Sequence, residues 1–128
     1  MFRKLVLILG LFLVFCSFTN GQTAHTVTLN WTLSTDDVAT ICTTTTTCTQ
    51  TLYRAPKACT VALSTDFIPW ITGITASATS VVDNQVTVGN SYCYQLTFIV
   101  NNLESLPSNQ VIAVILPSSQ TNLTKIIK

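Results

Sequence analysis

The segment 86–117 constrains the fold of this chain more than any other part, because it predicts two consecutive strands with a turn before each. Its first half carries large apolar side chains at every second position: Tyr92, Tyr94, Leu96 and Phe98. Side chains with this spacing face one side of a strand, so Tyr92, Tyr94 and Leu96 are expected in a core. Gly89 supplies the first turn, and the polar run 101–109 supplies the second before the apolar run 111–116.

Residues 27–33 form a second alternating run, which predicts a strand with Trp31 on its buried face. Other short strands are expected up to Arg54 and over 77–83, and no stretch shows the 3.6-residue period of a helix. About seven short strands at even spacing are typical of an antiparallel β-sandwich. We therefore expect one all-β domain over residues 25–117.

The stretch 58–72 is the hardest part of the chain to interpret. It contains an apolar run, but Pro69 has no N–H group to donate to a ladder and cannot occupy a central strand. Gly73 then predicts a turn. We expect irregular structure here, followed by the strand over 77–83.

Residues 1–21 have the features of a signal peptide. Arg3 and Lys4 precede an apolar run over 5–18, and small and polar residues follow. The run is shorter than the ~20 residues that a membrane span needs, which argues against an uncleaved anchor. Lipidation of Cys16 would require a small residue before it, and a phenylalanine stands there. We expect export to the medium, the cell surface or the periplasm, with no stable membrane span after cleavage.

Removal of the signal peptide leaves a chain with few charges. Four basic residues (Arg54, Lys57, Lys125, Lys128) remain against five acidic ones (Asp36, Asp37, Asp66, Asp83, Glu104), a net charge of −1. This balance offers no basic patch, so no nucleic-acid partner is expected. The last two lysines belong to a polar tail, 118–128, which is expected to be solvated.

An even number of cysteines follows the signal peptide: Cys42, Cys48, Cys59 and Cys93. In a small exported chain this number indicates two disulfides, and the residues alone leave three pairings open. The threonine run 43–47 offers no apolar face, so a loop closed by a disulfide is expected there. Metal binding is the competing interpretation, but the chain has no CxxC pair and one histidine, so no metal site is expected.

No combination of side chains predicts catalysis. His25 lies near the start of the mature chain, where a Ser-His-Asp system would depend on a fraying end. Asp36 and Asp37 are expected in a solvated turn, and Asp83 is expected to bond local backbone. The chain has no glycine-rich phosphate loop. We therefore expect neither an enzyme nor a cofactor.

Two aromatic residues are the remaining candidates for surface contacts. Tyr53 should lie on the outer face of its strand if Leu52 is buried, and Trp70 lies in the irregular stretch. Exposed tyrosine and tryptophan side chains anchor protein partners or stack on sugars. For Trp70 an alternative stays open, namely that it caps one end of the core.

Taken in order, several short motifs resemble the fibronectin type III family in its bacterial and phage form. His25-Thr-Val-Thr-Leu-Asn-Trp31 is similar to the family's second strand with its core tryptophan, and Leu52-Tyr53-Arg54 is similar to the end of its third strand. The resemblance is strongest over four pieces: Ile71-Thr-Gly-Ile-Thr75, Val82-Asp83, Val86-Thr-Val-Gly-Asn-Ser-Tyr92 and Ser105-Leu-Pro-Ser-Asn109. It implies an immunoglobulin-like antiparallel β-sandwich over residues 25–117.

The resemblance also implies roles for individual residues. Val86, Gly89 and Tyr92 stand where the family has its Leu-x-Pro-Gly-x-x-Tyr pattern. By that resemblance Tyr92 is the corner tyrosine, whose hydroxyl bonds to backbone across the loop.

The same resemblance selects a disulfide pairing. The family's third and sixth strands are antiparallel neighbours, which brings Cys59 to Cys93, with Cys93 turned away from the core. Cys42 then pairs with Cys48 and closes the threonine loop.

This sequence departs from the family in two places. The excursion between Cys42 and Cys48 is longer than the usual connection, and little room for a first strand remains before His25. The sheet edge beside 27–33 is therefore expected to be open to pairing with another strand. Residues 123–127 or a second chain are the candidates to fill it.

These expectations combine into a secreted, non-catalytic adhesion or recognition module. Its partner would be a protein or carbohydrate at a cell surface, contacted through the loops 34–49 and 101–109, because loops on a rigid sandwich commonly carry recognition. The alternative is a structural subunit of an extracellular assembly that self-assembles, its missing first strand being supplied by a neighbour.

Overall fold

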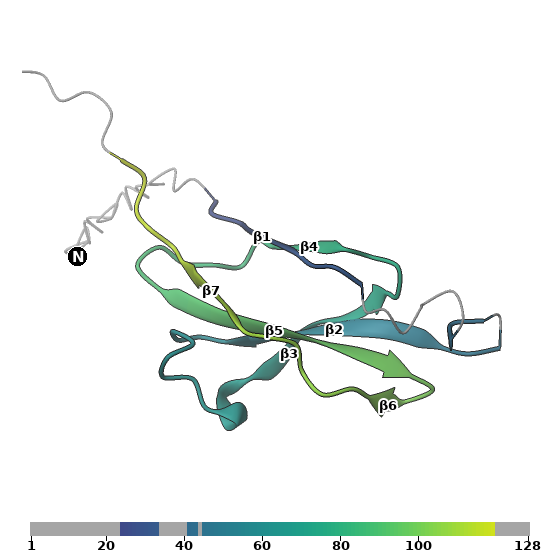
Figure 1. Cartoon of the computed structure of the whole chain (residues 1–128). Helices are drawn as coiled ribbons and strands as arrows, with labels where there is room; N and C mark the ends of the chain where they lie inside the picture. Colours follow the sequence, from purple (N-terminus) through teal and green to yellow (C-terminus); the bar gives the residue numbers. More distant parts are fainter. Residues whose placement is uncertain (1–23, 34–40, 44, 120–128) are drawn as a thin grey trace, which may run out of the picture.

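The computed structural model describes residues 24–33, 41–43 and 45–119, which fold almost entirely into strands (Figure 1). The strands are β1 (Val27–Asn30), β2 (Cys48–Ala55), β3 (Ile68–Thr75), β4 (Ser80–Asp83), β5 (Ser91–Val100), β6 (Leu103–Glu104) and β7 (Val111–Val114). A short 3-10 helix, Ser64–Asp66, precedes β3. The prediction of an all-β chain is confirmed.

The strands form two antiparallel sheets that lie in separate layers (Figure 1). The smaller sheet contains β1 and β4. The larger sheet has the order β3-β2-β5, and both β6 and β7 pair with the remaining edge of β5. β2 and β5 are therefore its central strands, whereas β3 and β7 lie at its edges.

The ladder between β2 and β5 organises the larger sheet. It runs from Cys48 opposite Val100 to Ala55 opposite Cys93. The antiparallel pairing expected between these two segments is thus present. Period-two alternation places Leu52 and Tyr94 in the core, where only 2% and 1% of these residues is exposed.

β3 corrects the expectation of irregular structure before residue 73. Pro69 lies within this strand, opposite Tyr53, which is compatible with its missing N–H group because β3 is an edge strand. Gly73 does not make a turn. It sits inside β3 with φ +66° where the register with β2 shifts, so it forms a bulge that glycine adopts without steric cost.

The connection from β5 to β7 begins with a tight hairpin. Asn101 and Asn102 have φ of 48° and 67°, the two positive values that a type I′ turn between β5 and β6 requires. Ser105 and Ser108 then continue along β5, and their Oγ atoms accept the N–H groups of Phe98 and Leu96, each at 3.0 Å. The edge of β5 is therefore satisfied between β6 and β7.

The core between the two sheets is centred on Leu52, Ile74, Tyr92, Tyr94 and Ile115. The side chains expected inward from residues 27–33 are half-buried and alternate with exposed ones, as the sequence pattern predicts. Trp31 and Leu96, both expected in the core, are half-buried at its margin.

Several expectations fall on parts of the chain outside the description. The signal peptide 1–21, the pair Asp36-Asp37 and residues 123–127 lie outside the described residues, and so does most of the tail 118–128. Ser118 and Ser119 are described and exposed. Within the described ranges, no helix is long and apolar enough to cross a membrane.

Candidate functional site

A buried ion pair closes one end of the core. Arg54, near the end of β2, donates from Nη1 to Asp83 Oδ2 at 2.8 Å and to the carbonyl oxygen of Gln85 at 3.0 Å. Asp83 ends β4 and is 1% exposed, and it also accepts from the Tyr94 hydroxyl at 2.9 Å and from the Gln85 N–H at 2.9 Å. The local backbone bond expected for Asp83 is present, together with an ion pair that the sequence analysis missed.

Two aromatic rings enclose the guanidinium of Arg54. Its Cζ lies 3.1 Å from the ring centroid of Trp70 and 4.8 Å from that of Tyr92. Trp70 is half-buried against the core, so the structure places it in the capping position that was left open. We call Arg54, Asp83, Tyr94, Tyr92 and Trp70 the Arg54 cluster. Its charges are paired and stacked, as buried charges need to be.

The Arg54 cluster shifts the pKa values of Asp83 and Tyr94. Burial alone would raise the pKa of Asp83, but hydrogen bonds from Gln85, Arg54 and Tyr94 outweigh it and hold that pKa below its usual value. Burial and the hydrogen bond to the Asp83 carboxylate raise the pKa of Tyr94 far above its usual value. Asp83 is therefore ionised and Tyr94 neutral at physiological pH, which suits a structural ion pair.

Tyr92 is the second residue of β5, and its hydroxyl bonds to loop backbone as the family resemblance implies. The Thr87 N–H donates to the Tyr92 hydroxyl oxygen at 3.0 Å, so the ring spans the loop that leads into the strand. Tyr92 is 5% exposed. Its role is to fix the loop to the core.

Tyr53 lies on the outer face of the larger sheet, half-buried. Its hydroxyl donates to Glu104 Oε1 at 2.7 Å, and the Thr97 hydroxyl donates to the same oxygen. The hydrogen bond to Glu104 raises the pKa of Tyr53, while the bonds from Thr97 and Tyr53 lower the pKa of Glu104. The tyrosine expected to reach a partner is thus already engaged by its own chain.

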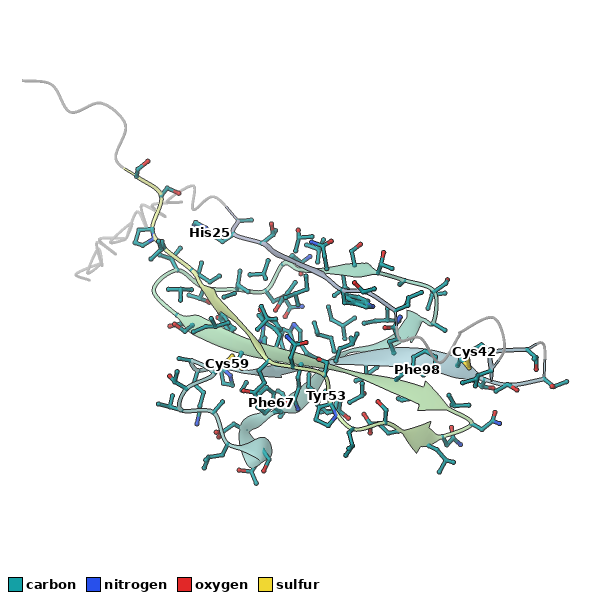
Figure 2. The ribbon with its side chains drawn as sticks, viewed as in Figure 1. His25, Cys42, Tyr53, Cys59, Phe67 and Phe98 are labelled. Carbon is teal, nitrogen blue, oxygen red and sulfur yellow. A yellow bond between two sulfur atoms is a disulfide. The ribbon has the colours of Figure 1, made fainter. Side chains whose placement is uncertain are left out.

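The two disulfides lie at opposite ends of the molecule (Figure 2). Cys42 pairs with Cys48 across the threonine loop, and Cys59 pairs with Cys93 at the start of β5. Both pairs match those implied by the family resemblance. Cys93 is fully buried on the face of β5 opposite to Tyr92 and Tyr94, covered by the segment that carries Cys59.

The outer edge of β1 is unpaired among the described residues. The N–H of Trp31 donates to the Thr79 carbonyl at 2.9 Å, and the register continues through Leu29 opposite Val81. In an antiparallel ladder the alternate residues direct both backbone groups away from the partner strand. Thr28 and Asn30 therefore present free N–H and C=O groups at this edge.

Beside that edge, the residues that the structure describes leave part of the core uncovered. Two adjoining hollows of about 690 Å³ and 340 Å³ share Trp31, Thr32, Leu96 and Ser108 in their walls. We call them together the β1 groove; its apolar lining is Leu29, Trp31, Leu33, Ile41, Leu52, Leu96, Phe98, Val100, Leu103, Leu106 and Val111. Figure 2 shows Phe98 on β5 toward the end of the molecule that carries Cys42, away from Cys59.

One buried polar atom of Trp31 lacks a partner among the described residues. The indole nitrogen is shielded from solvent, and no described residue supplies a hydrogen-bond acceptor for it. Buried donors are paired in the great majority of cases, because an unpaired one costs about 1–3 kcal/mol. The groove therefore combines half-buried apolar side chains with a strand edge that is unpaired among the described residues, and one of its walls holds the buried Trp31 donor.

An apolar hollow beside an unpaired strand edge is an arrangement that an added strand can occupy. The residues that the structure describes contain no group of three or more His, Cys, Asp or Glu side chains able to hold a metal ion. Sequence reasoning found the open edge but not the hollow beside it. The hollow depends on how far the second sheet extends over Leu96 and Phe98, which no local pattern encodes.

Comparison of the chain with family models, with curated proteins and with solved structures found no match.

Proposed function

We propose that this chain is a non-catalytic structural subunit of an extracellular or cell-surface assembly. It would have a fibronectin type III-like sandwich that lacks its first strand, and it would join its neighbours by accepting a strand along the outer edge of β1. The observation that carries the proposal is the β1 groove, where backbone groups and apolar side chains are uncovered along the same line.

The strand arrangement supports the family part of the proposal. β1 and β4 form one sheet, opposite a sheet of order β3-β2-β5-β7. If β1 is the family's second strand and β4 its fifth, this is the arrangement that the resemblance implies. Tyr92, bonded to the Thr87 backbone, occupies the position of the corner tyrosine. In that family the first strand would lie beside β1, where the groove is.

The two disulfides support export. Disulfides form and persist in oxidising compartments such as the periplasm and the extracellular space. With the signal-peptide pattern at residues 1–21, they favour a secreted or surface protein.

Self-association through the edge of β1 tests the proposal. Thr28→Pro removes an N–H group that points away from β4, and it leaves the β1–β4 ladder intact because proline is tolerated at a free edge. Thr28→Ala is the matched control. In sedimentation velocity, the chain from residue 22 onward and Thr28→Ala should associate as concentration rises, while Thr28→Pro should stay monomeric. A wild-type chain that stays monomeric at high concentration would overturn the proposal.

One observation favours a second function, adhesion or recognition through a loop. Residues 101–110 are all exposed, and among them Leu103 and Leu106 leave 78% and 90% of their surface to solvent. Exposed leucines on a loop held by Ser105 and Ser108 are suited to contact a protein partner. Leu106→Ala should then weaken binding to an isolated cell-surface partner in a pull-down. Unchanged binding after alanine substitution of both leucines would remove this candidate.

A further inference from the structure

The segment beside the β1 groove is long enough to pair with one additional strand. The seven residues 27–33 span about 23 Å at the rise of a strand. An added strand would pair with the outward backbone groups of Thr28 and Asn30 and would direct every second side chain into the hollow. Its occupant must therefore be an extended segment of about seven residues with apolar side chains on one face.

The chain carries such a segment after β7. Residues 120–128 include Leu123 and Ile127, which are four positions apart and so lie on the same face of an extended strand. Lys125 falls between them on that face. Glu104 is the one charged residue among the described residues of the groove wall, and the charged side chains of the segment, Lys125 and Lys128, are positive.

The path of the chain after β7 favours insertion into a second copy. Residues 116–119 are exposed, and the chain leaves β7 past the end of the sheets at which β1 begins (Figure 1). Nine residues, 120–128, reach about 30 Å when extended, enough to cover 27–33 of a neighbour. To cover its own β1 the chain must first reverse, and a turn takes about four residues. Insertion into a second copy requires no such reversal.

We propose that segment 120–128 of one copy lies along β1 of a second copy and fills its β1 groove with Leu123 and Ile127. The inference rests on the proposed function and names the strand that the groove accepts. The interface is head to tail, since the donated segment and the groove are different surfaces. Backbone pairing along the edge supplies affinity, and the two apolar side chains supply register.

A complementation experiment tests this occupant in the full chain from residue 22 onward. The donor variant, Leu123→Asp with Ile127→Asp, has a disrupted segment and an intact groove. The acceptor variant, Thr28→Pro, has a disrupted strand edge and an intact segment. The control Asn122→Asp with Thr124→Asp places the same charges on the other face of the segment. Sedimentation velocity should show assembly of the wild type and the control, and monomers for each of the two variants alone.

Mixing the donor and acceptor variants should produce dimers and nothing longer, because one intact groove meets one intact segment. A labelled peptide of residues 120–128 should bind the donor variant at least tenfold more tightly than a chain that also carries Thr28→Pro.

The outcomes separate the two proposals. If the donor variant assembles like the wild type while Thr28→Pro does not, the groove accepts a different strand and this inference falls alone. If Thr28→Pro assembles like the wild type, or if the wild type never assembles, the proposed function falls with it. Mixed variants that remain monomeric, or a peptide that binds both chains equally, would also overturn the inference.

Discussion

The two ends of the core differ in how completely the chain covers itself. At one end the Arg54 cluster buries an ion pair, stacks it between two rings and satisfies each carboxylate oxygen of Asp83. At the other end the β1 groove leaves Phe98 and Leu96 half-covered, with the Trp31 indole N–H unpaired. Both ends share β2 and β5, so the difference comes from the second layer, which is only two strands wide.

This difference separates a closed end of the core from an open one. The closed end concentrates interactions that are costly to break. The Cys59–Cys93 disulfide lies at this end, because Cys93 is near the start of β5, opposite Ala55. At the open end, the described residues leave the outer edge of β1 unpaired. Substitutions at the closed end should therefore change folding, and those at the open end should change association.

The largest effect is expected from breaking the ion pair. Asp83→Ala leaves the Arg54 guanidinium buried without its partner, which should lower the free energy of unfolding by about 3–5 kcal/mol. The matched control is Asp66→Ala, which breaks the half-exposed pair with Lys57 and should change stability little. Urea unfolding of both variants measures the difference. An equal loss of unfolding free energy in the two variants would contradict the view that the buried ion pair stabilises the fold more than the half-exposed one.

Removing the disulfide at the closed end should cost more stability than removing the one at the threonine loop. Cys59→Ser with Cys93→Ser opens a loop of sequence separation 34 and should cost up to about 4 kcal/mol in the chain-entropy model. Cys42→Ser with Cys48→Ser opens one of separation 6 and should cost about 2 kcal/mol. Thermal unfolding monitored by circular dichroism compares the double variants. A larger loss from the pair at the threonine loop would reverse the ranking.

Acid should weaken the closed end through Asp83. Because the pKa of Asp83 is lower folded than unfolded, its stabilising contribution is full above about pH 4 and is lost as pH falls through the folded value. The urea midpoint of the wild type should drop between pH 4 and pH 2. In Asp83→Asn the drop should be smaller, and an identical pH profile in the two proteins would show that other carboxylates control it.

The smallest changes in stability are expected from substituting one aromatic residue at each end, Tyr92 at the closed end and Trp31 at the open end. Tyr92→Phe removes the acceptor of the Thr87 N–H and should cost about 1 kcal/mol. Trp31→Phe removes an indole N–H that has no acceptor, which offsets part of the lost apolar contact, so stability should stay within about 1 kcal/mol of the wild type. Urea midpoints measure both. A clearly larger cost at Trp31 would mean that the open end is better packed than its uncovered surface indicates.

Alternation and turn chemistry predicted much of this molecule. The period-two runs at 27–33 and 92–98 become β1 and β5, and the pair Asn101-Asn102 gives the tight turn that its polar run indicates. The Pro69 segment was misjudged because proline excludes a central strand but not an edge strand. Edge position depends on tertiary arrangement, which a local pattern does not contain.

The Arg54 cluster could have been found from the same alternation. Leu52 is buried, so Arg54, two residues later, faces the same side of β2, and Val81 places Asp83 inward on β4 in the same way. Two opposite charges directed into one core indicate an ion pair. The β1 groove had no such signal, because its shape depends on how the two sheets overlap in space rather than on any one run of residues.

The unpaired edge of β1 bears on how an assembly of these chains would lengthen. If copies join as proposed, a row of them has two unlike ends, and the groove stays empty only on the copy at one end. The apolar surface left to water is then that of one groove, whatever the number of copies, so the exposed share per copy falls as the row lengthens. Elongation itself would protect these chains from non-specific aggregation, and a dedicated cap would be needed only at one tip.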